Sequence, residues 1–156
     1  MAYIEVRALL IFVLLMSSAA GAKTLTGRVV GVTDGDTLTM LDSGSNTVKI
    51  RLAEIDAPEK KQPFGARSKE SLSDLCYDKA ATADVQAKDR YGRTVARIKC
   101  DGVDANAAQI SRGMAWVYDK YVKDKSLYQL QDEARAARLG LWSDPEPMQP
   151  WEWRHR

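Results

Sequence analysis

Histidine and cysteine are scarce in this chain, and their scarcity excludes several kinds of enzyme. The 156 residues contain one histidine, His155, and two cysteines. One histidine beside the end of the sequence cannot supply a histidine pair, a histidine-centred metal site or a Ser-His-Asp triad. Two cysteines are too few for a four-cysteine zinc site. Hydrolytic chemistry would therefore depend on carboxylates, arginines and an oxygen-ligated metal ion.

The chain also lacks a large excess of positive charge, and it has a single long apolar run. Its net charge is +2, so any site for a polyanion must be local. The apolar run, residues 8–16, lies between Arg7 and small residues at 20–22, as is typical of a secretory signal peptide, and it is too short to span a bilayer. We expect residues 1–22 to be a signal peptide of an exported protein, periplasmic or extracellular, with no membrane attachment after cleavage. The alternative is an uncleaved anchor.

Short β-branched and apolar segments, separated by glycine and turn signals, predict about five strands. The predicted strands cover residues 24–32, 37–41, 47–55, 82–88 and 94–100. Five short strands with glycine bends favour a small, partly closed barrel over a flat sheet.

Helix signals follow the strands and predict about three helices. The first covers residues 64–76, the second lies between a capping Asp104 and Gly113, and the third covers residues 126–138, beginning at a capping box. Strands followed mostly by helices indicate an α+β domain, and the length suits one hydrophobic core. We place this domain at residues 23–143.

The last residues, 144–156, differ in composition from the domain. They contain three prolines and two tryptophans, together with arginine and histidine. We expect this Pro/Trp-rich segment to be a flexible C-terminal tail. The alternative is a basic and aromatic contact with nucleic acid.

Acidic side chains and an arginine gather near the end of the third predicted strand. Folding the second predicted strand onto the third sets Thr37 opposite Arg51 and leaves Asp36 beside the arginine. Two further acids follow the strand end within RLAEIDAPE, residues 51–59. We expect four side chains to converge on one side of the barrel: Asp36, Arg51, Asp56 and Glu59.

Two carboxylates held close together repel each other unless a cation lies between them. Asp36, Asp56 and the carbonyl of Ala57 form an oxygen set that suits Ca²⁺ or Mg²⁺. Glu59 is not needed as a ligand and can accept a proton from water. Arg51 presents planar donors that match phosphate oxygens. Taken singly, each acid has the alternative reading of a turn or solvent-facing residue.

Three sequence blocks in this order resemble the staphylococcal nuclease (thermonuclease) family. They are DGDT at 34–37, RLAEIDAPE at 51–59 and DRYGRTVA at 89–96, and GLW at 140–142 resembles the helix-terminal ending of the family. The resemblance covers about residues 25–143. It implies a five-stranded oligonucleotide/oligosaccharide-binding (OB) barrel with three helices, in agreement with the strand and helix patterns.

The resemblance also implies an activity and a cofactor. Family members are Ca²⁺-dependent nucleases that cleave DNA and RNA with little sequence preference. Carried over to this sequence, one Ca²⁺ ion is held by Asp36, Asp56 and the backbone carbonyl of Ala57. Glu59 then acts as a base or as a water-orienting group.

The arginines have implied roles of their own. The resemblance assigns phosphate contacts to Arg51 and Arg93. Arg93 begins a predicted strand with Arg97 and Lys99 on the same face, and Arg90 extends this row into a local positive stripe. The alternative is a solvated basic face without a ligand.

Family members stack the nucleotide base on tyrosines. Tyr121 matches one such position, whereas Asp119 stands at the other. Trp116 and Tyr118 lie near enough in the sequence to replace the missing tyrosine, although we expect one of them to belong to the core.

Two rival functions remain compatible with the sequence. One is an OB-fold module that binds single-stranded nucleic acid without cutting it, and the other is an exported domain that uses Ca²⁺ for stability alone. We expect a monomer, because no surface stripe demands a protein partner.

The two cysteines of an exported chain most simply form one disulfide. Cys76 ends the first predicted helix and Cys100 ends the fifth predicted strand. Their bond would close a loop of about 25 residues and contribute roughly 3 kcal/mol to stability. The alternative is a pair of buried free thiols.

Overall fold

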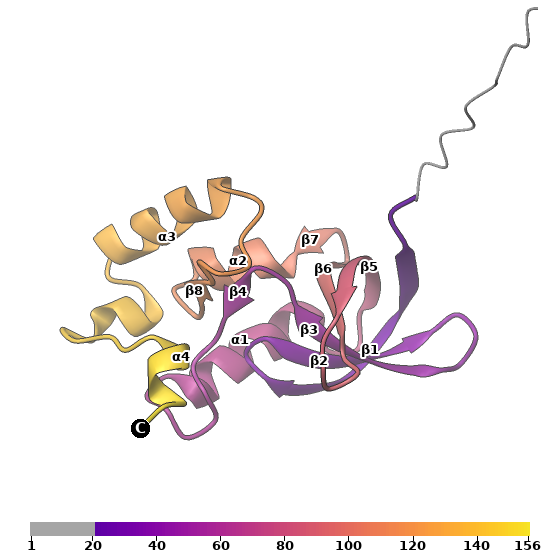
Figure 1. The fold of residues 1–156 in the computed structure, drawn as a ribbon, viewed down its shortest axis with the longest axis horizontal. Coiled ribbons are helices and arrows are strands. Elements are labelled where there is room, and N and C mark those ends of the chain that lie inside the picture. Colours follow the sequence, from indigo (N-terminus) through magenta and orange to yellow (C-terminus); the bar gives the residue numbers. More distant parts are fainter. Residues whose placement is uncertain (1–20) are drawn as a thin grey trace, which may run out of the picture.

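The structure is a computed structural model that describes residues 21–156 (Figure 1). The predicted signal peptide, residues 1–22, therefore lies almost entirely outside the described residues. Within the described part, none of the helices has the length and apolar character that a membrane span requires. In chain order the elements are β1 (Thr24–Asp34), β2 (Thr37–Asp42), β3 (Thr47–Leu52), β4 (Ile55–Asp56), α1 (Gly65–Cys76), β5 (Ala80–Lys88), β6 (Thr94–Cys100), β7 (Val103–Asp104), α2 (Ala105–Ser111), β8 (Trp116–Val117), α3 (Ser126–Ala136), the 3₁₀-helix η1 (Gly140–Ser143) and α4 (Pro150–Trp153).

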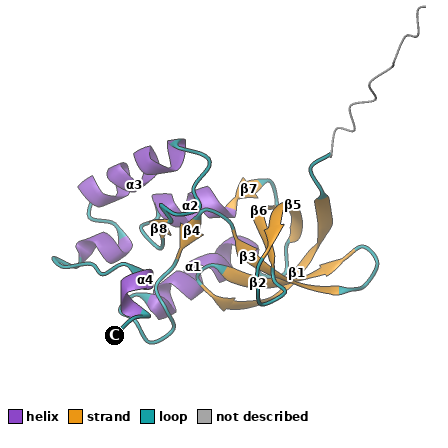
Figure 2. Cartoon of the chain, in the orientation of Figure 1, coloured by secondary structure: helices purple, strands orange, loops and turns teal. Residues whose placement is uncertain are grey.

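Five of the strands close into a barrel of mixed direction. They follow the order β3-β2-β1-β5-β6 with antiparallel neighbours, and a parallel pairing of β3 with β6 completes the ring (Figure 2). Register shifts in β1, between Val29 and Gly31 and between Val32 and Asp34, are irregularities of the kind that bend a strand. The predicted α+β fold, a five-stranded OB-type barrel with three longer helices, is confirmed.

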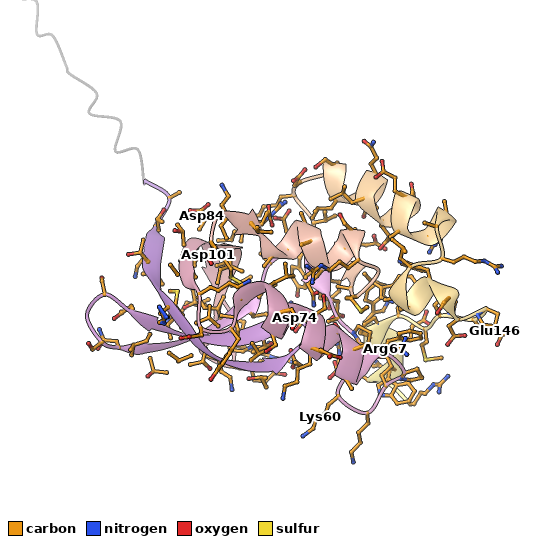
Figure 3. The ribbon with its side chains drawn as sticks, turned by 180° about the vertical axis from the view of Figure 1, so that it is seen from behind. Lys60, Arg67, Asp74, Asp84, Asp101 and Glu146 are labelled. Carbon is orange, nitrogen blue, oxygen red and sulfur yellow. A yellow bond between two sulfur atoms is a disulfide. The ribbon has the colours of Figure 1, made fainter. Side chains whose placement is uncertain are left out.

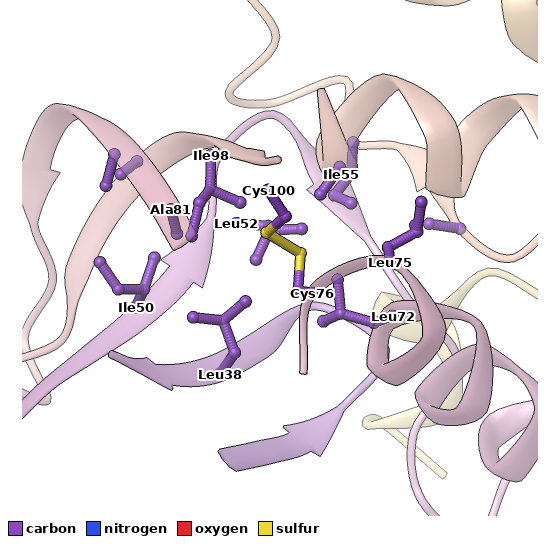
Figure 4. Packing of buried hydrophobic residues seen from close by; sticks show 14 of the residues in the cluster. Leu38, Ile50, Leu52, Ile55, Leu72, Leu75, Cys76, Ala81, Ile98 and Cys100 are labelled. Carbon is purple, nitrogen blue, oxygen red and sulfur yellow. A yellow bond between two sulfur atoms is a disulfide. The ribbon is translucent and has the colours of Figure 1, made fainter. Parts of the chain in front are cut away.

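Alternate residues of the strands fill the inside of the barrel. Leu38, Met40, Ile50, Leu52 and Ile98 are completely buried and pack against the side chains of α1 (Figure 4). Burying a side chain of this size is worth about 1.5–3 kcal/mol. This core supports the strand ends, where the polar residues of the candidate site begin.

A disulfide joins the barrel to its first helix. Cys76, at the end of α1, is bonded to Cys100, at the end of β6, and the two Cα atoms are 5.1 Å apart (Figure 4). Both cysteines are buried within the core. Of the two arrangements that the sequence left open, the structure has the disulfide.

The strand predicted at 47–55 is two separate strands. β3 ends at Leu52, because Glu54 adopts a left-handed backbone conformation with φ of +69° and turns the chain away from the barrel. The chain then forms β4, in which Ile55 pairs with Val117 of β8. This turn directs the next acid of the segment, Asp56, to the junction between the barrel and the helices.

Two helix boundaries differ from the sequence-based prediction. Helix α1 begins at Gly65, because Phe64 has φ of +68° and is not helical. The predicted capping box at the start of α3 is not formed: Asp124 accepts the backbone N–H and the hydroxyl of Ser126, at 3.0 and 2.6 Å. Helix α3 ends at Ala136, two residues early. One acceptor outside the helix, Asp124, thus replaces the predicted capping box of Ser126 and Gln129.

The C-terminal segment, residues 144–156, is packed rather than flexible, which corrects the sequence-based expectation. It forms helix α4, which lies beside the connection between β4 and α1 (Figure 1). The ring of Trp151 stacks on Tyr118 at 5.4 Å between centroids, and the carbonyl of Met148 accepts a hydrogen bond from Gln62 at 2.8 Å. Composition suggested a linker, but these aromatic and amide contacts hold the segment against the domain.

Candidate active site

The pairing of β2 with β3 places the first acid beside the first arginine. Thr37 is the partner of Arg51, the register expected from the connecting loop. The carbonyl of Asp36 accepts the N–H of Leu52 at 2.8 Å, so Asp36 lies directly next to Arg51 at the barrel rim. Local strand pairing thus accounts for this contact.

Two glycines let the neighbouring segments approach this rim closely. A Cβ atom at Gly35 would collide with the side chain of Ser68 on α1, and a Cβ atom at Gly65 would collide with the carbonyl of Glu59. Their missing side chains allow α1 to pack against both the β1–β2 turn and the loop after β4. The acids carried by that turn and that loop are brought together as a result.

Arg51 holds the two aspartates in one buried cluster. Its Nη2 atom lies 3.2 Å from Oδ2 of Asp36 and 3.1 Å from Oδ1 of Asp56. Its Nη1 atom donates to the carbonyls of Leu52 and Ile55, at 2.6 and 2.9 Å, which fixes the guanidinium plane. Asp56 is almost fully buried, with a side chain that is 1% exposed. The predicted convergence of these three residues is observed.

The next two residues of the predicted set lie alongside. The N–H of Ala57 donates to Oδ2 of Asp36 at 2.7 Å, so the Ala57 peptide is adjacent to the aspartate pair. Glu59 is connected to Asp56 through a third residue, Arg154, whose Nη1 atom lies 2.7 Å from Oε1 of Glu59. The Nη2 atom of Arg154 lies 2.8 Å from Oδ2 of Asp56.

Sequence reasoning missed Arg154. It is separated from Asp56 by 98 positions and belongs to the segment that was expected to be a flexible tail. The one signal pointing to it was the presence of cations among the tryptophans at 151–156. Hydrogen bonds to Asp56, followed in importance by those to Glu59, raise the pKa of the Arg154 guanidinium, which is therefore charged at every physiological pH.

Two acids at this rim, Asp56 and Asp34, are harder to ionise than ordinary aspartates. Burial, together with the charge of Asp36, raises the pKa of Asp56 to about 6, against the opposing hydrogen bond from Arg154. Burial and the same neighbouring charge raise the pKa of Asp34 to about 6. Carboxylates that are costly to ionise in water-excluded surroundings gain more from a nearby cation than solvent-exposed ones. The site therefore favours a bound cation.

The donor set fits a hard divalent cation. Asp36 and Asp56 each direct an oxygen at the same Arg51 nitrogen, so these oxygens converge on one region. Across residues 21–156 no group of three or more histidine, cysteine, aspartate or glutamate side chains is arranged to hold a metal. An ion at this pair would take its remaining ligands from a carbonyl, such as that of Ala57, and from water. Ca²⁺ accepts such all-oxygen, partly hydrated coordination.

The second predicted phosphate ligand, Arg93, lies directly before the neighbouring strand β6. The parallel pairing of β3 with β6 sets Arg51 beside Val95, and Arg93 precedes Val95 by two residues on the same face. The Nε atom of Arg93 lies 2.6 Å from Asp89. Arg90 is exposed and lies over the ring of Tyr91, at 4.9 Å from its centroid. These two arginines lie in the β5–β6 turn, just before the strand that pairs with β3.

The predicted positive stripe is wrong at Arg97. This guanidinium binds three acids: Glu54 at 3.5 Å, Asp104 at 2.8 Å and Asp124 at 3.0 Å. Strand alternation correctly predicted the face of β6 on which Arg97 lies. It could not predict that Glu54 and Asp124, which lie in other parts of the chain, would meet Arg97 there. Arg97 is part of an internal network and is not available to a phosphate.

The aromatic residues divide into core and surface. Trp116 is buried, as expected for one member of its pair, and Tyr118 is covered by Trp151. Tyr121 is 55% exposed and meets Tyr118 edge to face at 4.9 Å. Asp119, at the position of the second family tyrosine, accepts the hydroxyl of Tyr128 at 2.6 Å. Tyr121 is thus the member of this group that presents its ring to solvent.

Charged side chains of both signs lie on the surface near the start of α1. Figure 3 shows Lys60 and Arg67 there, with Glu146 at the same end of the molecule. Asp84 and Asp101 lie at the other end, on the barrel.

Comparisons with known proteins agree on one family. The family model described as "Staphylococcal nuclease homologue" matches residues 49–144. An "Uncharacterized endonuclease" of Haemophilus influenzae is 46% identical over 148 residues, which is 95% of this chain and 82% of the relative. A second "Uncharacterized endonuclease", of Escherichia coli O157:H7, is 47% identical over 131 residues, 83% of this chain and 85% of the relative. The "Micrococcal nuclease" of Shigella flexneri is 40% identical over 159 residues, 95% of this chain and 91% of the relative. The chain belongs to the staphylococcal nuclease family.

Proposed function

We propose that this protein is a Ca²⁺-dependent endonuclease that hydrolyses phosphodiester bonds of DNA and RNA with little sequence preference. The observation that carries the proposal is the buried contact of one arginine with two aspartates, Arg51 with Asp36 and Asp56. Relatives named endonuclease or micrococcal nuclease, at 40–47% identity, support the nuclease activity in this proposal.

Each residue of the cluster has a role that follows from its surroundings. Asp36, Asp56 and the carbonyl of Ala57 would hold the cation, which supplies positive charge to neutralise the phosphate and to polarise water. Arg51 is already fixed by two backbone carbonyls, so its Nη2 atom can contact a phosphate oxygen without losing its orientation. Glu59 has a 37% exposed side chain and can accept a proton from an attacking water molecule.

The surrounding surface provides contacts that do not depend on sequence. Arg93 and Arg90 would bind phosphates, and the exposed ring of Tyr121 would stack on a base. These groups recognise the charge and the flat faces that all nucleotides share. We therefore propose that DNA and RNA are both substrates and that base preference is slight.

The decisive assay measures degradation of single-stranded DNA and RNA with Ca²⁺ and with EDTA. We expect cleavage in Ca²⁺ and none in EDTA. The variant Glu59→Gln should lose about 10²-fold or more in kcat if Glu59 acts as the general base. The matched control, Glu70→Gln on the exposed face of α1, should retain the wild-type rate.

Two outcomes would count against the proposal. Tight binding of nucleic acid without cleavage would indicate a non-catalytic OB module. Neither binding nor cleavage would leave a domain in which the acids serve stability alone.

We further propose that the protein is exported after removal of residues 1–22. The apolar run near the N-terminus and the disulfide between Cys76 and Cys100 support export, because structural disulfides are rare in the cytosol. Mass spectrometry of the protein purified from its source should give a chain that begins near Lys23. A mass that includes Met1 would contradict the proposal.

A further inference from the structure

We propose that the C-terminal segment, residues 144–156, competes with the divalent cation for the active-site acids. In the docked state Arg154 occupies the carboxylates of Asp56 and Glu59, and cation binding releases the segment. The proposal rests on the proposed function in one respect, namely that Asp56 is a ligand of the cation.

The guanidinium of Arg154 takes up both oxygens of Asp56. Its Nη2 atom is 2.8 Å from Oδ2 and its Nη1 atom is 3.2 Å from Oδ1, while Nη1 also lies 2.7 Å from Glu59. This fork geometry is the strongest arrangement available to an arginine and a carboxylate. Arg154 therefore satisfies the same charges that a metal ion would satisfy.

Because Asp56 is buried, a metal ion and Arg154 cannot bind its carboxylate at the same time. Its side chain is 1% exposed, and within residues 21–156 every hydrogen bond to the carboxylate comes from Arg51 or Arg154. Arg51 is fixed by its two bonds to backbone carbonyls, whereas the Arg154 side chain is 37% exposed. Ca²⁺ needs its oxygen ligands at about 2.3–2.6 Å, so an ion bound to an Asp56 oxygen would compete with Arg154, which lies 2.8 Å from Oδ2 and 3.2 Å from Oδ1. The ion must displace Arg154, because that is the partner on the solvent side.

The contact between the segment and the domain is incompletely packed. Helix α4 has four residues, and a cavity of about 130 Å³ lies between the segment and the domain, lined among others by Phe64, Trp116, Met148 and Trp153. An incompletely filled contact gives less dispersion energy than a close-packed one. Segments with few buried contacts open locally at small free-energy cost.

Docking also covers part of the aromatic surface. Trp151 stacks in parallel on Tyr118, with 4° between the ring planes, and Tyr118 meets the exposed Tyr121. Release of Arg154 would free the Trp151 ring at the same time. Cation binding is therefore coupled to uncovering of Tyr118, next to Tyr121, where a nucleotide base is expected to stack.

The experiment is a calorimetric titration with Ca²⁺ alone, without nucleic acid. A protein whose binding-competent state is a minor fraction shows an affinity reduced by that fraction. We therefore expect Arg154→Ala to bind Ca²⁺ about tenfold more tightly than the wild type. Arg156→Ala, which removes a neighbouring cation that lies over Trp153, should change the affinity less than about twofold.

A second variant and a second readout test the release itself. Trp151→Ala weakens docking without touching the acids, so it should also tighten Ca²⁺ binding. In the wild type, Ca²⁺ should increase hydrogen exchange at the backbone amides of residues 151–156. Far-UV circular dichroism checks that each variant is folded.

The outcomes separate this proposal from the proposed function. Unchanged or weaker Ca²⁺ binding by folded Arg154→Ala would overturn the competition and leave the nuclease assignment standing. Absence of Ca²⁺ binding in the wild type and in both variants would overturn the cation site and the competition together. Unchanged hydrogen exchange on Ca²⁺ binding would also overturn release of the segment.

Discussion

Glu54 and Asp56 stand two residues apart in one segment, and each is buried against arginine, yet their surroundings differ. Glu54 accepts the backbone N–H groups of Lys123 and Asp124, both at 2.7 Å, and the Gln86 amide at 3.0 Å. Asp56 has only arginine side chains as partners within the described residues, and one of them comes from the C-terminal segment. Backbone donors surround Glu54, whereas Asp56 is paired with two arginine side chains, one of which, Arg154, belongs to the C-terminal segment.

This difference in surroundings moves the pKa values of Glu54 and Asp56 in opposite directions. Burial would raise the pKa of Glu54, but the hydrogen bonds from Asp124, Lys123 and Gln86, together with the charge of Arg97, outweigh it and hold the pKa below its usual value. Burial dominates at Asp56 and raises the pKa to about 6. A charge that fixed dipoles already satisfy serves stability, whereas a charge that only cations satisfy is suited to binding one.

The largest expected effect is a loss of cleavage rate when Arg51 is replaced. Replacing Arg51 by alanine should lower kcat by about 10²–10³, the loss typical of a donor that stabilises developing charge. The measurement is the initial rate of DNA cleavage at saturating Ca²⁺ and substrate. Arg28→Ala, which breaks an exposed pair with Asp78, should leave the rate unchanged. An equal loss in the two variants would refute a specific role for Arg51.

The second effect concerns stability rather than rate. Replacing Arg97 by alanine leaves Glu54 buried without its cation and should reduce the free energy of unfolding by about 3 kcal/mol. Urea unfolding followed by circular dichroism measures this difference. The exposed pair lost in Arg28→Ala should cost at most about 0.5 kcal/mol. Similar losses of unfolding free energy in the two variants would show that the ion pairs of Glu54 stabilise the fold no more than an exposed pair does.

The smallest expected effect is a pH dependence of folding stability that arises from Asp34. Its pKa is raised to about 6, so the folded state binds the proton more tightly than the unfolded chain, and this stabilisation is lost as pH rises from about 4 to about 6. The variant Asp34→Asn has no carboxyl group to ionise at this position, so it should not lose this stabilisation as pH rises. Relative to the wild type, the variant should gain up to about 2 kcal/mol between pH 4 and pH 7 in EDTA. Parallel stability curves from urea unfolding would contradict the raised pKa.

The sequence predicted the parts of this molecule that depend on local pairing. The contact of Asp36 with Arg51 follows from strand alternation and a short loop, and Asp56 comes five residues later. These relations need no knowledge of how the helices pack, which is why the candidate site could be outlined without coordinates.

The parts that escaped prediction are long-range. Arg154 meets Asp56 across 98 positions, through a segment whose composition is also that of a linker. Arg97 is neutralised by Asp124, 27 positions away, on a loop that no periodic pattern places. Whether a surface arginine is available to a ligand depends on such partners, and only tertiary packing supplies them.

The most direct test of the account compares the two acids in one cleavage assay. Asp56→Asn and Glu54→Gln are matched changes, since each removes one negative charge and keeps nearly the same shape. We predict that Asp56→Asn loses about 10²-fold or more in the rate of DNA cleavage with Ca²⁺. Glu54→Gln should stay within about tenfold of the wild type at a temperature where it is folded. Full activity in folded Asp56→Asn would contradict a cation-dependent nuclease site at this aspartate.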